Sequence, residues 1–501
     1  MDPEDVSRRA VLLGATALGA SAALGWLPPT RRASAANGTS TPASDGPYVP
    51  TAQSLGQHPG AAWFRDAKFG IFIHWGVYAV PAWGDALAYH PAEWYSYAMH
   101  IGASGLDTTY QHHLHAYGAD VNYDDLIPQF TAANYDPRAW VELFERAGAR
   151  YFVLTSKHHD GFQLFPNTAS DRNSVMMGPH RDLVGELFHA ARNSSLKRGL
   201  YHSLGEFFSP ALDTPPWNPY THEPIPYVGY KPIDDYVSQY LHVMVKTLID
   251  RYDPDLLWGD GHHWHEDLGA GPAFKPKDMN WHSNELLAYY YNNAVNRSRP
   301  KEVMVNDRFE ASHADFSIIE GDVSSYSLRS SKWEACLTLG RSWGYDTNED
   351  PAKIKSPSRL VQLLVDIVSK NGNLLLNVGP RPDGTIPDWQ SERLLAIGNW
   401  LLTNGTAIYD TAPWTRAGDG NLRYTVSEGS FNILGLTWPQ LSFLTVPADL
   451  PIASDSQIRL LGDEGHKARF RRTDAGVEID LPARNPNGEG YPFVLTVKHA
   501  R

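Results

Sequence analysis

The sequence predicts an α/β protein, a (β/α)8 TIM-like barrel followed by a small C-terminal antiparallel β-sandwich. Three observations lead to this prediction. Short, almost continuously apolar runs recur between residues 69 and 378 of the 501-residue chain, helical patterns separate several of these runs, and after residue 414 the runs become partly alternating. Strands that are covered on both faces require continuous apolar sequence, and this is the situation of parallel strands enclosed by helices.

Eight runs are predicted to be the parallel strands of the barrel. Ile71-Phe72-Ile73 and Leu374-Leu375-Leu376 are examples that lack the alternation of a half-exposed sheet. The eight predicted strands are Phe69–Gly76, Tyr151–Ser156, Arg198–Leu204, Asp255–Gly259, Glu302–Asn306, Asp315–Glu320, Trp333–Leu339 and Asn373–Val378.

Helix start signals and apolar stripes lie between several of these strands. Asp136 is followed by Pro137, and Ser356 by Pro357, which is typical of a capping residue and the first helical position. A third helical stripe runs from Tyr236 to Leu248. In a barrel with this strand and helix order, reactive groups gather at the carboxyl ends of the strands.

The remaining segments complete the predicted domain organisation. Residues 1–36 resemble a twin-arginine export signal, because Arg8-Arg9 precedes an Ala- and Leu-rich stretch and Ala33-Ser34-Ala35 offers a cleavage site. A retained membrane anchor is the less favoured alternative, since the stretch is only weakly apolar. Residues 37–57 are predicted to be a flexible lead-in, 58–414 the catalytic barrel and 415–501 the β-sandwich, with strands near 423–426, 431–434 and 477–481. A secreted, extracellular protein is expected.

The amino-acid composition excludes or disfavours several classes of ligand and site. A formal net charge of -13 disfavours nucleic acid or an anionic membrane as a partner and favours a neutral or cationic ligand. The single cysteine, Cys336, excludes an intrachain disulfide and a CxxC site. The 16 Trp are compatible with carbohydrate recognition, because flat rings stack on sugar C–H faces, although core packing is an equal explanation.

Polar residues follow one predicted strand after another. One such residue alone is usually the solvated start of a loop. Here they recur at strand after strand, and the predicted barrel would bring all of them to one rim. In chain order they are His74, His158 and His159, Tyr201, Asp260, Asn306-Asp307-Arg308 and Glu320.

Asp260 and Glu320 are the candidate catalytic pair. Asp260 follows an apolar strand and lies between Gly259 and Gly261, so its carboxylate would be accessible to attack a sugar's anomeric carbon, while Glu320 would protonate the departing oxygen. Retention of configuration requires the two carboxyl groups to lie about 5–5.5 Å apart. A helix cap or a salt bridge is the structural alternative for Asp260, and Asp322 or Glu334 are alternatives for the acid.

The other candidate residues suit a polyol ligand. Neutral imidazoles donate and accept hydrogen bonds, and Arg308 offers a planar fork of donors. Trp94 and Trp258 would stack on a sugar ring, or serve as ordinary barrel packing. No cofactor and no metal ion is expected.

Several separate motifs carry a family resemblance. The segments Trp63 to Gly76, Glu93-Trp94-Tyr95, Lys157 to Phe162, Asn306-Asp307-Arg308 and Asn377 to Pro380 together resemble glycoside hydrolase family 29, the retaining α-L-fucosidases. The resemblance covers roughly residues 61–414. It implies an exo-acting double displacement through a covalent glycosyl-enzyme on a fucosylated oligosaccharide or glycoconjugate, with Asp260 as nucleophile. It also implies that fucose is held by His74, Trp94, His158, His159, Tyr201, Trp258 and Arg308.

Three alternatives remain open at this stage. A metal-dependent hydrolase would use the histidine clusters at 112, 113 and 115 or at 262, 263 and 265, but the chain contains no H-E-x-x-H helix motif. A secreted fucose-binding protein without catalysis would use the same pocket. A retaining exoglycosidase for another sugar would share the mechanism.

Overall fold

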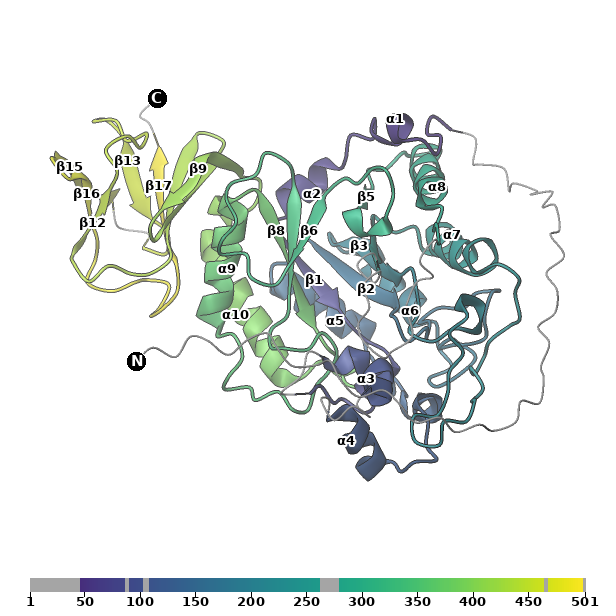
Figure 1. Cartoon of the computed structure of the whole chain (residues 1–501). Helices are drawn as coiled ribbons and strands as arrows, with labels where there is room; N and C mark the ends of the chain where they lie inside the picture. Colours follow the sequence, from purple (N-terminus) through teal and green to yellow (C-terminus); the bar gives the residue numbers. More distant parts are fainter. Residues whose placement is uncertain (1–45, 86–89, 102–107, 262–278, 464–466, 499–501) are drawn as a thin grey trace, which may run out of the picture. The chain divides into compact units, whose positions relative to one another are not determined.

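An eight-stranded parallel sheet forms the centre of the computed structural model, which describes residues 46–85, 90–101, 108–261, 279–463 and 467–498 (Figure 1). The strand order is β5-β4-β3-β2-β1-β8-β7-β6, and neighbouring strands in this order pair in parallel. All eight predicted strands are therefore confirmed. They are β1 Phe69–Ile73, β2 Tyr151–Lys157, β3 Lys197–Ser203, β4 Leu256–Asp260, β5 Met304–Val305, β6 Ser317–Glu320, β7 Trp333–Leu337 and β8 Gly372–Val378.

The curled sheet closes at its two edges through a single bridge. Strands β5 and β6 are the outer members of the order, and Asn306 pairs with Phe316 in an isolated parallel bridge between them. Strand β5 is only two residues long, shorter than predicted. The reason is that the Asn306 side chain, rather than its backbone, bonds the N–H and C=O of Gly259 on β4.

Both helices predicted from capping signals are present. Asp136 accepts hydrogen bonds from the N–H groups of Arg138 and Ala139 at the start of α5, and Ser356 accepts one from the N–H of Arg359 at the start of α9. The predicted 236–248 helix instead opens with a π-helical turn, η7 Val237–Leu241, and continues as α7.

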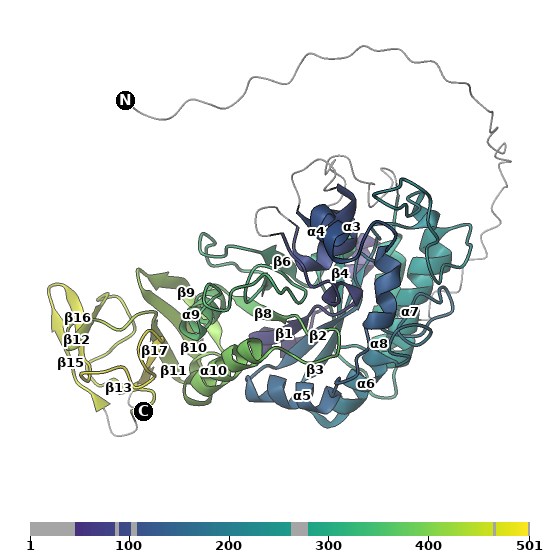
Figure 2. The ribbon, with the colours of Figure 1, turned by 90° about the horizontal axis from the view of Figure 1, so that it is seen from below.

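The helices cover the outer face of the sheet (Figures 1 and 2). Neighbours contact one another in a ring, α5 with α6, α6 with α7, α7 with α8, and α9 with α10, which also contacts α5. The fully described connections 306–316 and 321–332 contain no α-helix, so the covering is incomplete next to β6. The bounds are α1 Ala52–Leu55, α2 Ala62–Ala67, α3 Tyr95–Ile101, α4 Thr109–Ala116, α5 Pro137–Arg146, α6 Leu183–Ala190, α7 His242–Tyr252, α8 Ser283–Val295, α9 Pro357–Ser369 and α10 Asp388–Asn404.

Strand residues alternate between two cores. Ile71 and Ile73 pack outward with the helices, whereas Phe72 packs inside the barrel. Gly70 is also an inward position, and it leaves room for the ring of Tyr151, which would lie 2.5 Å from a Cβ atom there. The two apolar layers explain the continuous apolar sequence of the strands.

Two antiparallel sheets follow the barrel, as predicted. The C-terminal strands have their own core, but Leu434 and Val494 join the main barrel core, and the indole of Trp400 donates to the carbonyl of Pro492. One sheet has the order β14-β13-β17-β11-β10-β9 and the other β12-β16-β15. The bounds are β9 Ala412–Asp419, β10 Leu422–Ser427, β11 Ser430–Gly435, β12 Phe443–Val446, β13 Gln457–Leu460, β14 Lys467–Ala468, β15 Phe470–Thr473, β16 Gly476–Asp480 and β17 Phe493–Lys498.

The segment before the barrel differs from the predicted flexible lead-in where it is described. Leu55 is fully buried in the main core, and the backbone of Tyr48 makes two hydrogen bonds with the amide of Asn292. Tyr48 and Leu55 thus attach this segment to the barrel, while residues 49–53 between them are exposed. The predicted export signal, residues 1–36, lies outside the described residues. Among the described residues, no helix combines the length and apolar character needed to cross a membrane.

Candidate active site

All nine predicted site residues line one cavity of about 190 Å³. They come from the ends of six different strands or the loops that follow them, as expected at the carboxyl face of a barrel. Four further residues, which were not predicted for the site, complete the lining. The predicted residues are His74, Trp94, His158, His159, Tyr201, Trp258, Asp260, Arg308 and Glu320, and the additional ones are Phe72, Glu93, Cys336 and Trp343.

The alternation of side chains along a strand places Asp260 and Glu320 inside the barrel mouth. Trp258 packs inside the barrel, so Asp260, two residues further and at the end of β4, points the same way. Glu320 stands in the same relation to Ile318 at the end of β6. The two carboxylates thus reach one cavity, because the bridge between β5 and β6 leaves only β5 between β4 and β6.

Asp260 is held as a carboxylate by its neighbours. The hydroxyl of Tyr201 donates to Oδ2 at 2.8 Å, Arg308 Nη1 donates to Oδ1 at 3.1 Å, and His159 Nε2 lies 3.6 Å from Oδ2. Burial acts to raise the pKa of Asp260, but the Arg308 guanidinium, the His159 ring and the Tyr201 hydroxyl together hold the pKa below its usual range. Asp260 is therefore ionised at neutral pH.

Arg308 binds both candidate catalytic carboxylates. Its Nη1 donates to Asp260, and its Nη2 donates to Oε2 of Glu320 at 2.6 Å. The guanidinium also lies over the Trp258 ring, 5.1 Å from the ring centroid. The side chain of Asp260 is 15% exposed and that of Glu320 45% exposed, so the second carboxylate is the more open to solvent. The planar guanidinium of Arg308 thereby fixes the two carboxylates relative to each other.

The three site histidines are neutral at neutral pH. Burial lowers the pKa of His74 to about 3 and that of His159 to about 4, and it lowers the pKa of His158 well below the usual range. His74 Nδ1 is bonded to Oδ1 of Asn377 at 2.7 Å, and His159 Nδ1 to the hydroxyl of Ser203 at 2.6 Å. Neutral, oriented imidazoles can donate to or accept from sugar hydroxyls.

The two sequence alternatives for the acid lie elsewhere. Glu334 is fully buried below the cavity, where it accepts a hydrogen bond from the indole of Trp258 at 2.9 Å and contacts the hydroxyl of Tyr151 at 2.5 Å. It does not line the cavity, because it is only the second residue of β7. Asp322 is exposed, lies two residues beyond the end of β6 and bonds Ser324. Neither lines the cavity, whereas Glu320 does.

Glu93 and Trp343 are the main residues that the sequence analysis missed. The Glu93 carboxylate accepts hydrogen bonds from the N–H groups of Trp343 and Gly344, at 3.0 and 2.9 Å, and thereby holds the Trp343 loop against the cavity. Burial raises the pKa of Glu93 to about 8. The position of Glu93 directly before Trp94, a predicted site residue, could have indicated its role in the sequence. Trp343 lies in a long loop without regular structure, and no sequence pattern marked it.

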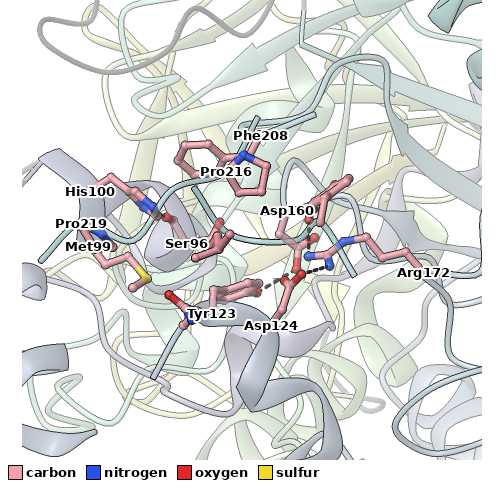
Figure 3. Close-up of a pocket in the computed structure, with 13 residues that line it drawn as sticks. Ser96, Met99, His100, Tyr123, Asp124, Asp160, Arg172, Phe208, Pro216 and Pro219 are labelled. Atoms are coloured by element: carbon pink, nitrogen blue, oxygen red, sulfur yellow. Dashed lines mark hydrogen bonds and ion pairs between the residues drawn. The ribbon is translucent and has the colours of Figure 1, made fainter. Parts of the chain in front are cut away.

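A second, small cavity lies behind the β2 end and belongs to the scaffold (Figure 3). Its volume is about 30 Å³. Arg172 forms an ion pair with Asp124 at 2.6 Å, and the hydroxyl of Tyr123 donates to Asp160 at 2.8 Å, as Figure 3 shows. Asp160 directly follows His159, and burial raises the pKa of Asp160 to about 6. This buried network fixes the loop that presents the two histidines.

The histidine clusters do not form the predicted alternative metal site where they are described. His112 stacks on Trp83, whereas His113 bonds the hydroxyl of Tyr95 and the carbonyl of Val121. Residues 262, 263 and 265 lie outside the described part of the chain. Within that part, the one group with ligand atoms close enough for a metal ion is His58, His313 and Asp315, none of which lines the cavity.

The barrel mouth holds an ionised aspartate and a glutamate that accept hydrogen bonds from the same arginine. Imidazole and indole rings surround them. This arrangement is typical of a glycoside hydrolase site. The chain belongs to the alpha-L-fucosidase family, whose profile matches residues 35–406.

Individual relatives agree with this assignment. Human tissue alpha-L-fucosidase is 36% identical over 460 residues, which cover 90% of this chain and 91% of the relative. The Thermotoga maritima alpha-fucosidase in complex with a mechanism-based inhibitor is 36% identical, with a TM-score of 0.74 over 90% of this chain and 100% of that chain. The same enzyme in complex with fucose is 35% identical, with a TM-score of 0.73 and the same coverage.

Proposed function

We propose that this protein is an exo-acting retaining α-L-fucosidase that hydrolyses terminal α-L-fucosyl residues of oligosaccharides or glycoconjugates. Family membership over most of the chain supports the sugar, and a similar enzyme has been solved with fucose. The observation that carries the mechanism is the pair Asp260 and Glu320 on the two nitrogens of Arg308. A cavity of about 190 Å³ suits one terminal monosaccharide.

Asp260 is the nucleophile of the first displacement. Its ionised carboxylate attacks the anomeric carbon, the C–O bond to the leaving group breaks, and a covalent glycosyl-enzyme forms. The protonated Glu320 transfers its proton to the departing oxygen. In the second displacement Glu320 accepts a proton from water, the water attacks the anomeric carbon, and the bond to Asp260 breaks. Two inversions give overall retention.

The remaining cavity residues hold the fucosyl ring. His74, His158 and His159 offer neutral nitrogens to the ring hydroxyls. Among the described residues the Nδ1 atom of His158 is buried without a hydrogen-bond partner, although the residue lines the cavity. Trp94 offers apolar surface to a C–H face of the ring, whereas Trp258, which lies beneath the Arg308 guanidinium, forms part of the cavity wall.

Replacement of the nucleophile tests the proposal. We expect Asp260→Gly to lower kcat for an aryl α-L-fucoside by about 10⁴-fold while the variant still binds fucose. Added azide should enter the space left by the carboxylate and yield the β-fucosyl azide, because a single displacement inverts configuration. The wild-type enzyme should release α-L-fucose as its first product, observed by NMR. Release of β-fucose first, or turnover unaffected in the variant, contradicts the assignment.

We also propose that the protein is exported through the twin-arginine pathway and acts outside the cytoplasm. Arg8-Arg9, the weakly apolar stretch and Ala33-Ser34-Ala35 support this proposal. In an expressing cell, the exported form should begin after the Ala33-Ser34-Ala35 site, as read by N-terminal sequencing. Replacement of both arginines by lysine should retain the full-length chain inside the cell. Unchanged export of that variant would contradict the proposal.

A further inference from the structure

A second hollow opens directly beside the active-site cavity. Its volume is about 440 Å³, and it shares Glu320, Cys336 and Trp343 with the active site. We refer to it as the leaving-group groove. The two spaces therefore meet at the side chain of the proposed general acid.

The groove exists because the barrel lacks a covering helix next to β6. The connection from β6 to β7, residues 321–332, contains no helix, so one wall comes from residues 320–323. The opposite wall comes from the residues after β7 and from the start of α9. The groove is thus built into the topology of the barrel mouth.

The proposed mechanism places the leaving group in this groove. Asp260 attacks the anomeric carbon from one side, and the bond that breaks points away from Asp260 toward the acid that protonates its oxygen. Glu320 is that acid, and its side chain lies at the junction of the two spaces. A sugar attached to the fucosyl ring would leave the cavity past Glu320 and enter the groove.

The groove carries three cationic side chains, Arg341, Lys355 and Arg359. Asp322 is its one acidic lining residue besides Glu320, and the Asp322 carboxylate already accepts hydrogen bonds from the N–H and hydroxyl of Ser324. Asp346 compensates the charge of Arg341, and Glu349 lies close enough to interact with Lys355. Arg359 is therefore the lining cation with the least compensated charge, and when Glu320 is protonated for catalysis only Asp322 remains as an anion in the lining itself. The mostly cationic lining contrasts with the formal net charge of -13 of the whole chain.

Two of the three cations are fixed in place. Arg341 Nη2 donates to the buried carboxylate of Asp346 at 3.1 Å and to the carbonyl of Gly84 at 3.3 Å. Lys355 Nζ donates to the carbonyl of Thr338 at 2.9 Å. Arg359, in the first turn of α9, is exposed. Fixed charges beside a binding groove attract an anion without the cost of ordering them first.

We propose that the leaving-group groove selects substrates in which the sugar next to fucose carries an anionic group, a carboxylate or a sulfate ester. The inference rests on the proposed function and specifies its substrate class. Arg341, Lys355 and Arg359 are the specificity-determining residues, and they act on the leaving group rather than on the fucosyl ring.

Three matched disaccharides test this preference. They carry α-L-fucose on galactose, on galacturonic acid and on galactose 6-sulfate, so that the neutral, carboxylate and sulfate forms are compared directly. The measured quantity is the ratio of kcat/KM for each anionic substrate to that for the neutral one. We expect the wild-type ratio to exceed one for at least one anion, and Arg359→Glu to lower it about three- to tenfold. The ratio should also fall as NaCl rises from about 0.05 to 0.5 M.

Arg65→Glu is the matched control, because it makes the same charge reversal away from the groove. Arg65 is exposed on α2, which precedes β1 and packs into the barrel from the end opposite the mouth, so this variant should keep the wild-type ratio. A preference for only one of the two anions identifies whether a carboxylate or a sulfate is recognised. Hydrolysis of the neutral disaccharide with a ratio of one or less, or with a ratio that Arg359→Glu leaves unchanged, overturns this inference alone. Failure to cleave any fucoside, including an aryl fucoside, overturns the proposed function and the inference with it.

Discussion

Arg308 is the residue that couples the two catalytic carboxylates. In the free enzyme both accept hydrogen bonds from its guanidinium, which helps to hold the pKa of Asp260 below its usual range. Glu320 must be protonated to act as an acid, so the contact with Arg308 Nη2 has to weaken when substrate binds. The exposure of the Glu320 side chain provides the freedom for this movement.

Loss of Glu320 should affect substrates according to their leaving groups. We expect Glu320→Gly to lower kcat/KM for a fucosyl disaccharide about 10²- to 10⁴-fold, because the departing alkoxide then lacks a proton. An aryl fucoside with a strongly acidic phenol should lose much less. Azide should accelerate turnover of this aryl substrate and give the α-fucosyl azide, since it attacks the covalent intermediate on Asp260.

The configuration of the azide product separates the two carboxylates. Formation of the β-azide from Glu320→Gly would show that this residue, rather than Asp260, is the nucleophile. Glu392→Gln serves as the control, because Glu392 is exposed on α10 and does not line the cavity or the groove; its kinetics should match the wild type.

Site residues at the ends of strands could be predicted from the sequence. Buried residues that hold neighbouring loops in place, such as Glu93, could not. His74, Asp260 and Glu320 follow apolar runs, so strand alternation and barrel topology place them together. The same reasoning separates Glu320 from Glu334 once the strand bounds are known, because one ends β6 and the other lies near the start of β7. Glu93 supports the site through backbone contacts to a distant loop, which periodicity does not reveal.

At the scale of elements, the shortest strand of the parallel sheet lies beside the proposed nucleophile. Strand β5 pairs with β4 at only two positions, Leu256 with Met304 and Leu257 with Val305. Beyond them, the buried amide of Asn306 accepts from the N–H of Gly259 at 2.8 Å and donates to its carbonyl at 3.0 Å. One side chain thus replaces the backbone pairing that would otherwise fix the residue before Asp260.

Removal of this amide should weaken both the fold and the activity. We expect Asn306→Ala to lower the free energy of unfolding by about 2–4 kcal/mol, because two buried backbone groups lose their partner. We also expect kcat to fall about 10- to 100-fold through displacement of Asp260. Denaturant titration and aryl-fucoside kinetics measure the two effects. Asn134→Ala, at an exposed asparagine, is the control; an Asn306→Ala variant with wild-type kcat would show that Gly259 holds its position without the amide.

At the scale of the whole molecule, the sequence predicted the order of strands and helices. It did not predict where the barrel lacks backbone pairing or a covering helix. Eight apolar runs and a later change of pattern were sufficient to predict the barrel and the two antiparallel sheets. The single-bridge closure between β5 and β6 and the helix-free connections 306–316 and 321–332 depend on how irregular loops pack. No periodicity encodes such packing, and the groove beside Glu320 is a consequence of it.

Glu334, inside the barrel, makes the free energy of unfolding depend on pH. Glu334 is fully buried between Tyr151 and Trp258, and burial raises its pKa from 4.5 to about 7. Between these two values the folded protein binds more protons at Glu334 than the unfolded chain does. The contribution of this residue to the free energy of unfolding is therefore complete below about pH 4.5 and is lost as the pH rises through 7, by about 3 kcal/mol in total.

Glu334→Gln should remove this pH dependence, because a neutral amide can accept from the indole of Trp258 and donate to the hydroxyl of Tyr151 at every pH. Relative to the wild type, we expect the Tm of the variant to increase steadily between pH 5 and pH 8. Thermal unfolding followed by fluorescence at several pH values measures this difference, with Glu392→Gln as the exposed control that shows no such trend. A constant difference in Tm across the range would mean that Glu334 keeps the same protonation state in the folded barrel throughout.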